Sequence, residues 1–126
     1  MQAQIIHPDP REEFYTDEGC YILESWNDPA DPSLSIARAR VRPGVSTRMH
    51  WLVATCERYL IISGTGRVQI ADLPEAPVAA GDVVVIPPDA HQRITNTGAD
   101  DLIFYALCTP RFTQTVYRDA AAPQDT

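Results

Sequence analysis

The sequence contains no lysine, and its ten positively charged side chains are all arginines. Seventeen acidic residues outweigh them and give a net charge of −7. Such a balance argues against nucleic acid and anionic membranes as partners. A guanidinium binds carboxylate or phosphate in a bidentate way that an ammonium does not, but the composition of the genome would also explain the missing lysine.

Long apolar segments and paired cysteines are also missing. No apolar run approaches the roughly 20 residues that a membrane-spanning helix needs. The first residues, MQAQIIHPDPREEF, lack the basic and apolar regions of a signal peptide, so we expect a cytoplasmic protein. The three cysteines, Cys20, Cys56 and Cys108, are far apart, which argues against a disulfide framework and a zinc knuckle. We expect them to be buried as small apolar side chains.

No stretch shows a sustained helical period, whereas eleven prolines and six glycines separate short apolar runs. This pattern predicts an all-β sandwich or barrel. The expected strands cover residues 20–26, 33–42, 47–54, 57–63, 66–71, 76–79, 82–86, 91–96 and 101–108. We expect one domain, 1–126, with its barrel core at about 33–109, an N-terminal arm at 1–32 and a flexible tail at 120–126.

Charge is segregated along the chain. Residues 1–31 hold eight acids and one arginine, whereas residues 33–71 hold six arginines and one acid, Glu57. Arg38, Arg40 and Arg42 alternate with small or apolar residues, so they share one face of the strand predicted at 33–42. That face lies either in solvent or at the mouth of a pocket, and the sequence leaves both open.

Two spaced motifs carry the most specific signal. Gly44, His50, Glu57 and Gly64 form the first, and Gly81, Pro87 and Asn96 form the second. In this order and spacing they resemble the cupin superfamily, in which a histidine pair and a glutamate of the first motif and a histidine of the second bind metal. The strings ERYLIISGTGRVQI and GDVVVIPPDAHQRITNTG resemble small single-domain bacterial cupins with a conserved barrel. The resemblance implies a double-stranded β-helix, or jelly roll, but no particular reaction.

The chain departs from the metal motif at two positions. Leu52 replaces the second histidine and Gln92 replaces the histidine of the second motif. The resemblance therefore leaves His50, Glu57 and Gln92 as ligands for one divalent first-row metal (Zn, Fe, Mn or Ni), with water completing the shell. The alternative is a metal-free, hydrogen-bonded polar cluster of the same three side chains. His91 should point to the opposite face from Gln92, unless the turn after Pro88 bulges.

Other residues are assigned to the pocket by strand alternation. We expect Glu57 and His50 to be catalytic, and Arg48, Tyr59, Gln92 and Tyr105 to bind substrate. Asp89, which replaces a glycine of the second motif, is acceptable in a turn. Trp51 should face away from the pocket, where it and Trp26 suggest a homodimer interface.

Three functions are compatible with these residues. The first is an enzyme that moves protons next to a carbonyl of a small anionic or sugar-like molecule, as an isomerase, epimerase or lyase, with or without metal. The second is a module that binds such a molecule without turnover. The third is a structural dimer with a vestigial metal site.

Overall fold

The computed structural model describes residues 1–120. Apart from Ala120, the predicted tail at 120–126 lies outside the described residues. All nine expected strands are present, although the one predicted at 47–54 is reduced to His50–Leu52. Two further strands, Phe14–Tyr15 and Tyr117–Asp119, and two 3-10 helices, Pro10–Glu12 and Gln114–Val116, were not predicted.

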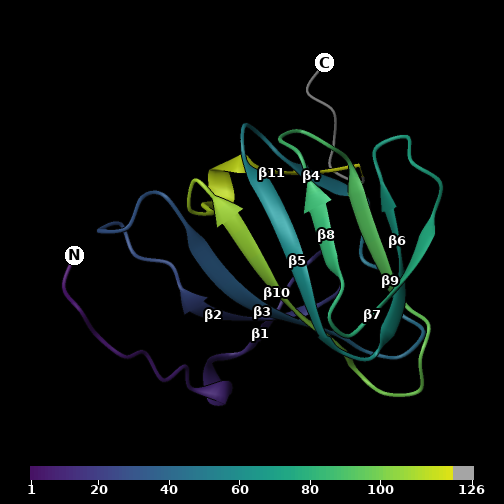
Figure 1. The fold of residues 1–126 in the computed structure, drawn as a ribbon, viewed down its shortest axis with the longest axis horizontal. Coiled ribbons are helices and arrows are strands. Elements are labelled where there is room, and N and C mark those ends of the chain that lie inside the picture. Colours follow the sequence, from purple (N-terminus) through teal and green to yellow (C-terminus); the bar gives the residue numbers. More distant parts are fainter. Residues whose placement is uncertain (121–126) are drawn as a thin grey trace.

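Two antiparallel sheets face each other and form the predicted jelly-roll barrel (Figure 1). The first sheet has the order β1-β2-β3-β10-β5-β8. Its strands are β1 Phe14–Tyr15, β2 Tyr21–Trp26, β3 Ser35–Val41, β10 Leu102–Thr109, β5 Cys56–Ser63 and β8 Val83–Ile86. The second sheet has the order β11-β4-β9-β6-β7. Its strands are β11 Tyr117–Asp119, β4 His50–Leu52, β9 Gln92–Asn96, β6 Thr65–Ile70 and β7 Ala76–Ala79.

The core lies between the sheets and follows strict side-chain alternation. On β10 every second residue is buried, from Leu102 to Cys108, and the others are half-buried on the outer face. Cys20 and Cys108 are buried as expected, whereas Cys56 is half-buried. The inner face of the barrel turns polar toward one end, where Glu57 and Gln92 are buried.

Asp89 holds the turn that precedes β9. Its φ of 66° lies in the left-handed region, where aspartate is tolerated better than most residues. Its Oδ1 accepts a hydrogen bond from the backbone N–H of Ala54 at 3.0 Å, which ties this turn to the one between β4 and β5. The turn therefore needs no bulge, and Gln92 is buried while His91 is exposed. His91 stacks on Trp51 outside the barrel, with ring centroids 4.1 Å apart.

The arginines of β3 lie on its outer face, which answers the question that the sequence left open. Ser35 and Ala37 line the cavity described below, whereas Arg38 and Arg40 pair with Glu13 of the N-terminal segment. Arg40 also bonds Asp101 at 3.0 Å and lies over the ring of Tyr21. The acidic first segment of the sequence thus docks onto its arginine-rich strand.

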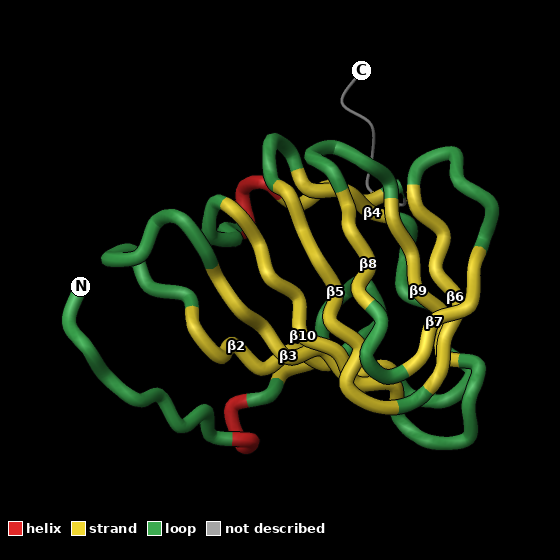
Figure 2. The backbone as a smooth tube through the Cα atoms, viewed as in Figure 1, coloured by secondary structure: helices red, strands yellow, loops and turns green. Residues whose placement is uncertain are grey.

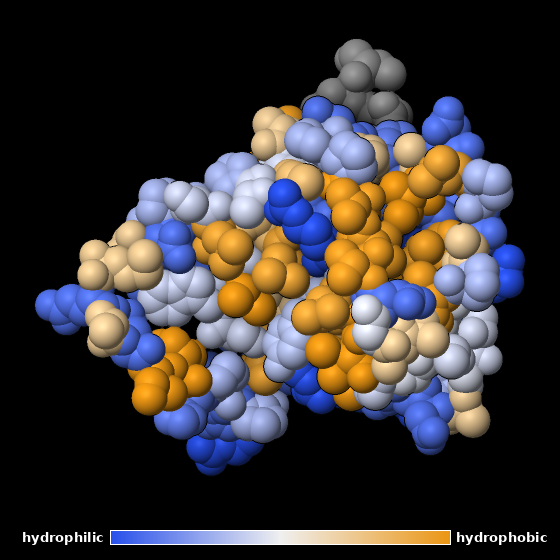
Figure 3. Space-filling view, viewed as in Figure 1, coloured by the Kyte–Doolittle hydropathy of each residue, from blue (hydrophilic) through white to orange (hydrophobic). Residues whose placement is uncertain are grey.

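Two other surface features bear on assembly. Before the first 3-10 helix, the chain runs away from the barrel without regular structure (Figure 2). The outer face of β5 and β8 exposes a continuous apolar area (Figure 3), to which Leu60, Ile62, Val83 and Val85 contribute. Among residues 1–120 there is no helix with the length and apolarity needed to cross a bilayer.

Candidate functional site

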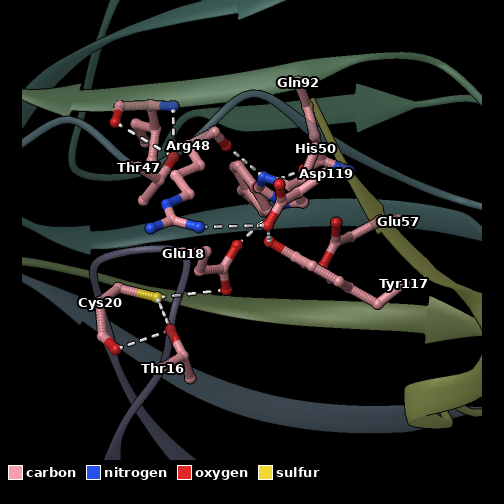
Figure 4. A network of polar contacts seen from close by, with 12 residues as sticks. Thr16, Glu18, Cys20, Thr47, Arg48, His50, Glu57, Gln92, Tyr117 and Asp119 are labelled. Carbon is pink, nitrogen blue, oxygen red and sulfur yellow. Dashed lines mark hydrogen bonds and ion pairs between the residues drawn. The ribbon is translucent and has the colours of Figure 1, made fainter. Parts of the chain in front are cut away.

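A cavity of about 550 Å³ opens at the polar end of the barrel. Its inner wall consists of residues from β3, β4, β5 and β10, among them His50, Leu52 and Glu57. Its outer walls come from the segment 14–18 and from residues 112–119, near the two ends of the described chain. Figure 4 shows the side chains of Glu18, His50, Glu57, Tyr117 and Asp119 gathered there.

His50 is held by acceptors at both ring nitrogens. Its Nδ1 lies 2.7 Å from the carbonyl oxygen of Arg48, and its Nε2 lies 3.0 Å from Oε2 of Glu18 (Figure 4). The ring is buried and stacks on Tyr117, with centroids 5.5 Å apart. A carbonyl can only accept, so Nδ1 is the nitrogen that donates to Arg48.

Glu57 is a buried carboxyl group beside His50. It is only 8% exposed, and its Oε1 has no hydrogen-bond partner, whereas its Oε2 lies 3.7 Å from Sγ of Cys108. Burial raises the pKa of Glu57 to about 7, although nearby His50 opposes the shift. A carboxyl group with such a pKa exchanges protons readily at neutral pH.

Gln92 lies next to His50 and Glu57 but does not line the cavity. It pairs with His50 across β9 and β4, and its amide stabilises the charged form of Glu57. Its Oε1 accepts a hydrogen bond from the hydroxyl of Tyr59, and its Nε2 is buried without a partner. Both Gln92 and Tyr59 lie in the core behind the cavity lining, so direct contact with a substrate stays a prediction for them.

The donor set does not fit the metal that the family resemblance implies. The side-chain oxygen of Gln92 is engaged by Tyr59, Nε2 of His50 is engaged by Glu18, and Leu52 has no donor atom. Across the described residues, 1–120, no three His, Cys, Asp or Glu side chains are placed to hold one ion. We therefore derive no chemical step through a metal.

Of the two other residues predicted to bind substrate, Arg48 lines the cavity and Tyr105 does not. Arg48 lines the cavity and lies 3.6 Å from Asp119, so it is available to a ligand. Tyr105 does not line the cavity, so its predicted contact with a substrate stays a prediction. It alternates with the buried residues of β10 and lies on the outer face, opposite Arg38 of β3.

Sequence reasoning missed four residues of the site: Glu18, Cys108 as a partner of Glu57, Tyr117 and Asp119. Glu18 follows a two-residue strand, and Tyr117 and Asp119 sit on a three-residue strand, so alternation gave no signal. The one sequence signal was the excess of acids in residues 1–31, from which we predicted no particular contact.

A family model described as a cupin domain matches residues 37–108. No curated protein matches the chain. A variant of Streptomyces Pac13 solved with uridine is similar, with a TM-score of 0.75 and 18% identity over 94% of this chain and 92% of that chain. Pac13 is described as a nucleoside dehydratase.

Two other solved structures have the same fold. KdgF from Halomonas sp. gives a TM-score of 0.78 at 13% identity, over 90% of this chain and 99% of that chain. A predicted oxalate decarboxylase from Thermotoga maritima gives 0.70 at 26% identity, over 83% of this chain and 93% of that chain. With more than half of its length matched by the family model, the chain belongs to the cupin family.

Proposed function

We propose that the cavity binds a small sugar-like molecule and moves protons on it, as an isomerase, epimerase or lyase. The observation that carries this proposal is Glu57, a buried carboxyl group at the cavity with one unpartnered oxygen and a pKa raised to about 7. A base with this pKa is substantially ionised at neutral pH and still basic enough to remove a proton next to a carbonyl. The nucleoside dehydratase activity of the similar Pac13 fold also supports the proposal.

In the proposed reaction Glu57 is the base and His50 the acid. Glu57 takes a proton from the carbon next to a carbonyl, and the electron pair of that C–H bond moves into an enolate. In an isomerisation His50 Nε2 protonates the enolate oxygen to give an enediol. Glu57 then returns its proton to the former carbonyl carbon while the neighbouring hydroxyl gives its proton back to His50 and becomes the new carbonyl. In a dehydration the same proton goes to a departing hydroxyl, which leaves as water. A ligand oxygen would have to replace Glu18 beside Nε2.

Solvent deuterium exchange tests this chemistry without knowledge of the product. The protein is incubated in D₂O with a pool of aldoses, ketoses and nucleoside aldehydes, and deuterium at carbon is followed by NMR. We expect exchange with the wild type, its loss in Glu57→Gln, and wild-type exchange in the outer-face control His91→Ala. Exchange that persists in Glu57→Gln, or no exchange with any substrate, contradicts the catalytic proposal.

The second candidate is a binding module without turnover. It is favoured by the contact between His50 and Glu18, because both ring nitrogens of His50 already have partners. A ligand that raises the melting temperature but shows no deuterium exchange would select this function. A structural dimer with a vestigial pocket predicts neither effect.

A further inference from the structure

The cavity lining carries a strong excess of negative charge. Five carboxyl side chains line it, against the single guanidinium of Arg48 and the imidazole of His50; the five are Asp17, Glu18, Glu24, Glu57 and Asp119. A cavity of one charge sign with apolar walls concentrates ligands of the opposite sign. An anionic ligand, which the sequence left as one option, would meet repulsion here.

Two of the five carboxylates already contact a basic side chain. Glu18 lies 3.0 Å from Nε2 of His50, and Asp119 lies 3.6 Å from Arg48. Within residues 1–120, no arginine forms an ion pair with Asp17, Glu24 or Glu57. The excess charge therefore lies on Asp17, on Glu24 and on the ionised fraction of Glu57, whose pKa is about 7. Burial also raises the pKa of Glu24, against a hydrogen bond from Asn27 that lowers it.

Glu57 provides an independent sign of a missing ligand. It is more than nine-tenths buried, it lines the cavity, and its Oε1 has no hydrogen-bond partner. A buried polar atom without a partner costs about 1–3 kcal/mol, so native proteins rarely leave one unless water or a ligand satisfies it. A donor from a bound molecule would satisfy this oxygen.

The walls of the cavity also suit an organic cation. Phe14, Tyr15, Phe112 and Tyr117 line it, and Phe14 and Tyr15 are exposed. Aromatic faces attract ammonium groups and provide apolar contact for the carbon atoms around them. A metal ion would gain nothing from these rings, and no three metal-binding side chains converge among the described residues.

We propose that the ligand of this cavity carries an ammonium group, so that the substrate class is an amino sugar. The proposal rests on the proposed function for the sugar-like part of the ligand. The ammonium group would lie among Glu24, Glu57 and the aromatic walls, where it supplies both the missing positive charge and a donor. The hydroxyl groups would face the polar side chains around His50.

Three probes with one carbon skeleton isolate the effect of charge. Glucamine, sorbitol and gluconate share a six-carbon polyol chain and carry a positive charge, no charge and a negative charge, respectively, at neutral pH. Each is titrated against isotope-labelled protein, and the backbone NMR signals of cavity residues report binding. We expect glucamine to bind about tenfold more tightly than sorbitol, equivalent to about 1.4 kcal/mol, and gluconate to bind most weakly. Added salt should reduce the preference for glucamine.

A matched pair of variants assigns the preference to the cavity. Glu24→Gln should remove most of the difference between glucamine and sorbitol, whereas Glu12→Gln, an exposed acid outside the lining, should leave it unchanged. Tighter binding of sorbitol or gluconate, or no binding by any of the three, overturns the inference. If glucamine binds most tightly of the three but no substrate shows deuterium exchange, the inferred ligand class is supported and only the catalytic proposal fails.

Discussion

Nε2 of His50 and Oε2 of Glu18 lie 3.0 Å apart, and both side chains are largely shielded from water. The contact joins the N-terminal segment to β4, because Glu18 lies in the turn between β1 and β2 and His50 begins β4. The backbone N–H of Arg48 reinforces this join by donating to the carbonyl oxygen of Glu18 at 2.8 Å. The cavity wall formed by residues 14–18 is therefore fixed to the barrel at the same point as the candidate acid.

Replacing Glu18 should destabilise the protein. Glu18→Ala removes the partner of a buried imidazole nitrogen, and we expect a loss of about 1–3 kcal/mol in the free energy of unfolding. Urea denaturation measures it, with Glu12→Ala as the exposed control. A midpoint unchanged from the wild type would show that solvent replaces Glu18 without cost.

Glu57 should make stability depend on pH. Its pKa is raised by burial from 4.5 to about 7, so the folded protein binds the proton more tightly than the unfolded chain does. The stability of the wild type should therefore fall as the pH rises from about 4.5 to 7. The loss should be on the order of 3 kcal/mol.

Glu57→Gln should remove this dependence, because an amide does not ionise. The comparison is the urea midpoint of the two proteins at pH 5 and pH 8, and the variant should gain relative to the wild type at the higher pH. A constant difference between the two proteins across this range contradicts a raised pKa.

Tyr59→Phe should weaken the core beside the cavity. The hydroxyl of Tyr59 is the donor to Oε1 of Gln92, and both side chains are buried. Its removal leaves a buried acceptor without a partner, at a cost of about 1–3 kcal/mol. Tyr105→Phe is the control on the outer face and should leave the thermal midpoint nearly unchanged. Equal effects of the two changes would mean that the contact with Gln92 contributes nothing.

The turn at Asp89 allows the hydrogen bond and the backbone conformation to be separated. Asp89→Gly keeps the positive φ accessible and loses only the bond to Ala54, whereas Asp89→Ala loses both. We expect Asp89→Ala to cost about 1–2 kcal/mol more than Asp89→Gly. Calorimetry of the two variants measures this difference, and the reverse order would contradict our account of the turn.

The homodimer predicted from Trp26 and Trp51 stays a prediction, but the structure suggests a different surface for it. Nε1 of Trp26 donates to Asp31 at 2.9 Å, and Trp51 is covered by His91. The exposed apolar area on β5 and β8 offers a larger contact. Light scattering should give a dimer for the wild type and for Leu73→Glu, and a monomer for Val83→Glu. A monomeric wild type would contradict the predicted homodimer.

The sequence was informative where a residue's neighbours along the chain determine its environment. Alternation placed Glu57, Gln92 and Trp51 on the faces where the structure has them, and the cupin resemblance carried by Gly44, His50 and Glu57 implied the barrel. Alternation could not choose which face of β10 lies inside, and Tyr105 lies on the outer one. It also gave no information on contacts such as that between Glu18 and His50, which depend on a short strand and a distant turn.

The origin of the cavity walls has a consequence for how such a protein changes over evolution. His50 and Glu57 belong to barrel strands, whose register is fixed by neighbours on both sides. The aromatic and acidic walls come from residues 14–18 and 112–119, which few ladder hydrogen bonds constrain. Apart from Glu18, which anchors the first segment to His50, substitutions in those two segments are expected to alter ligand choice at little cost to folding. Specificity and chemistry in this barrel are therefore free to diversify separately.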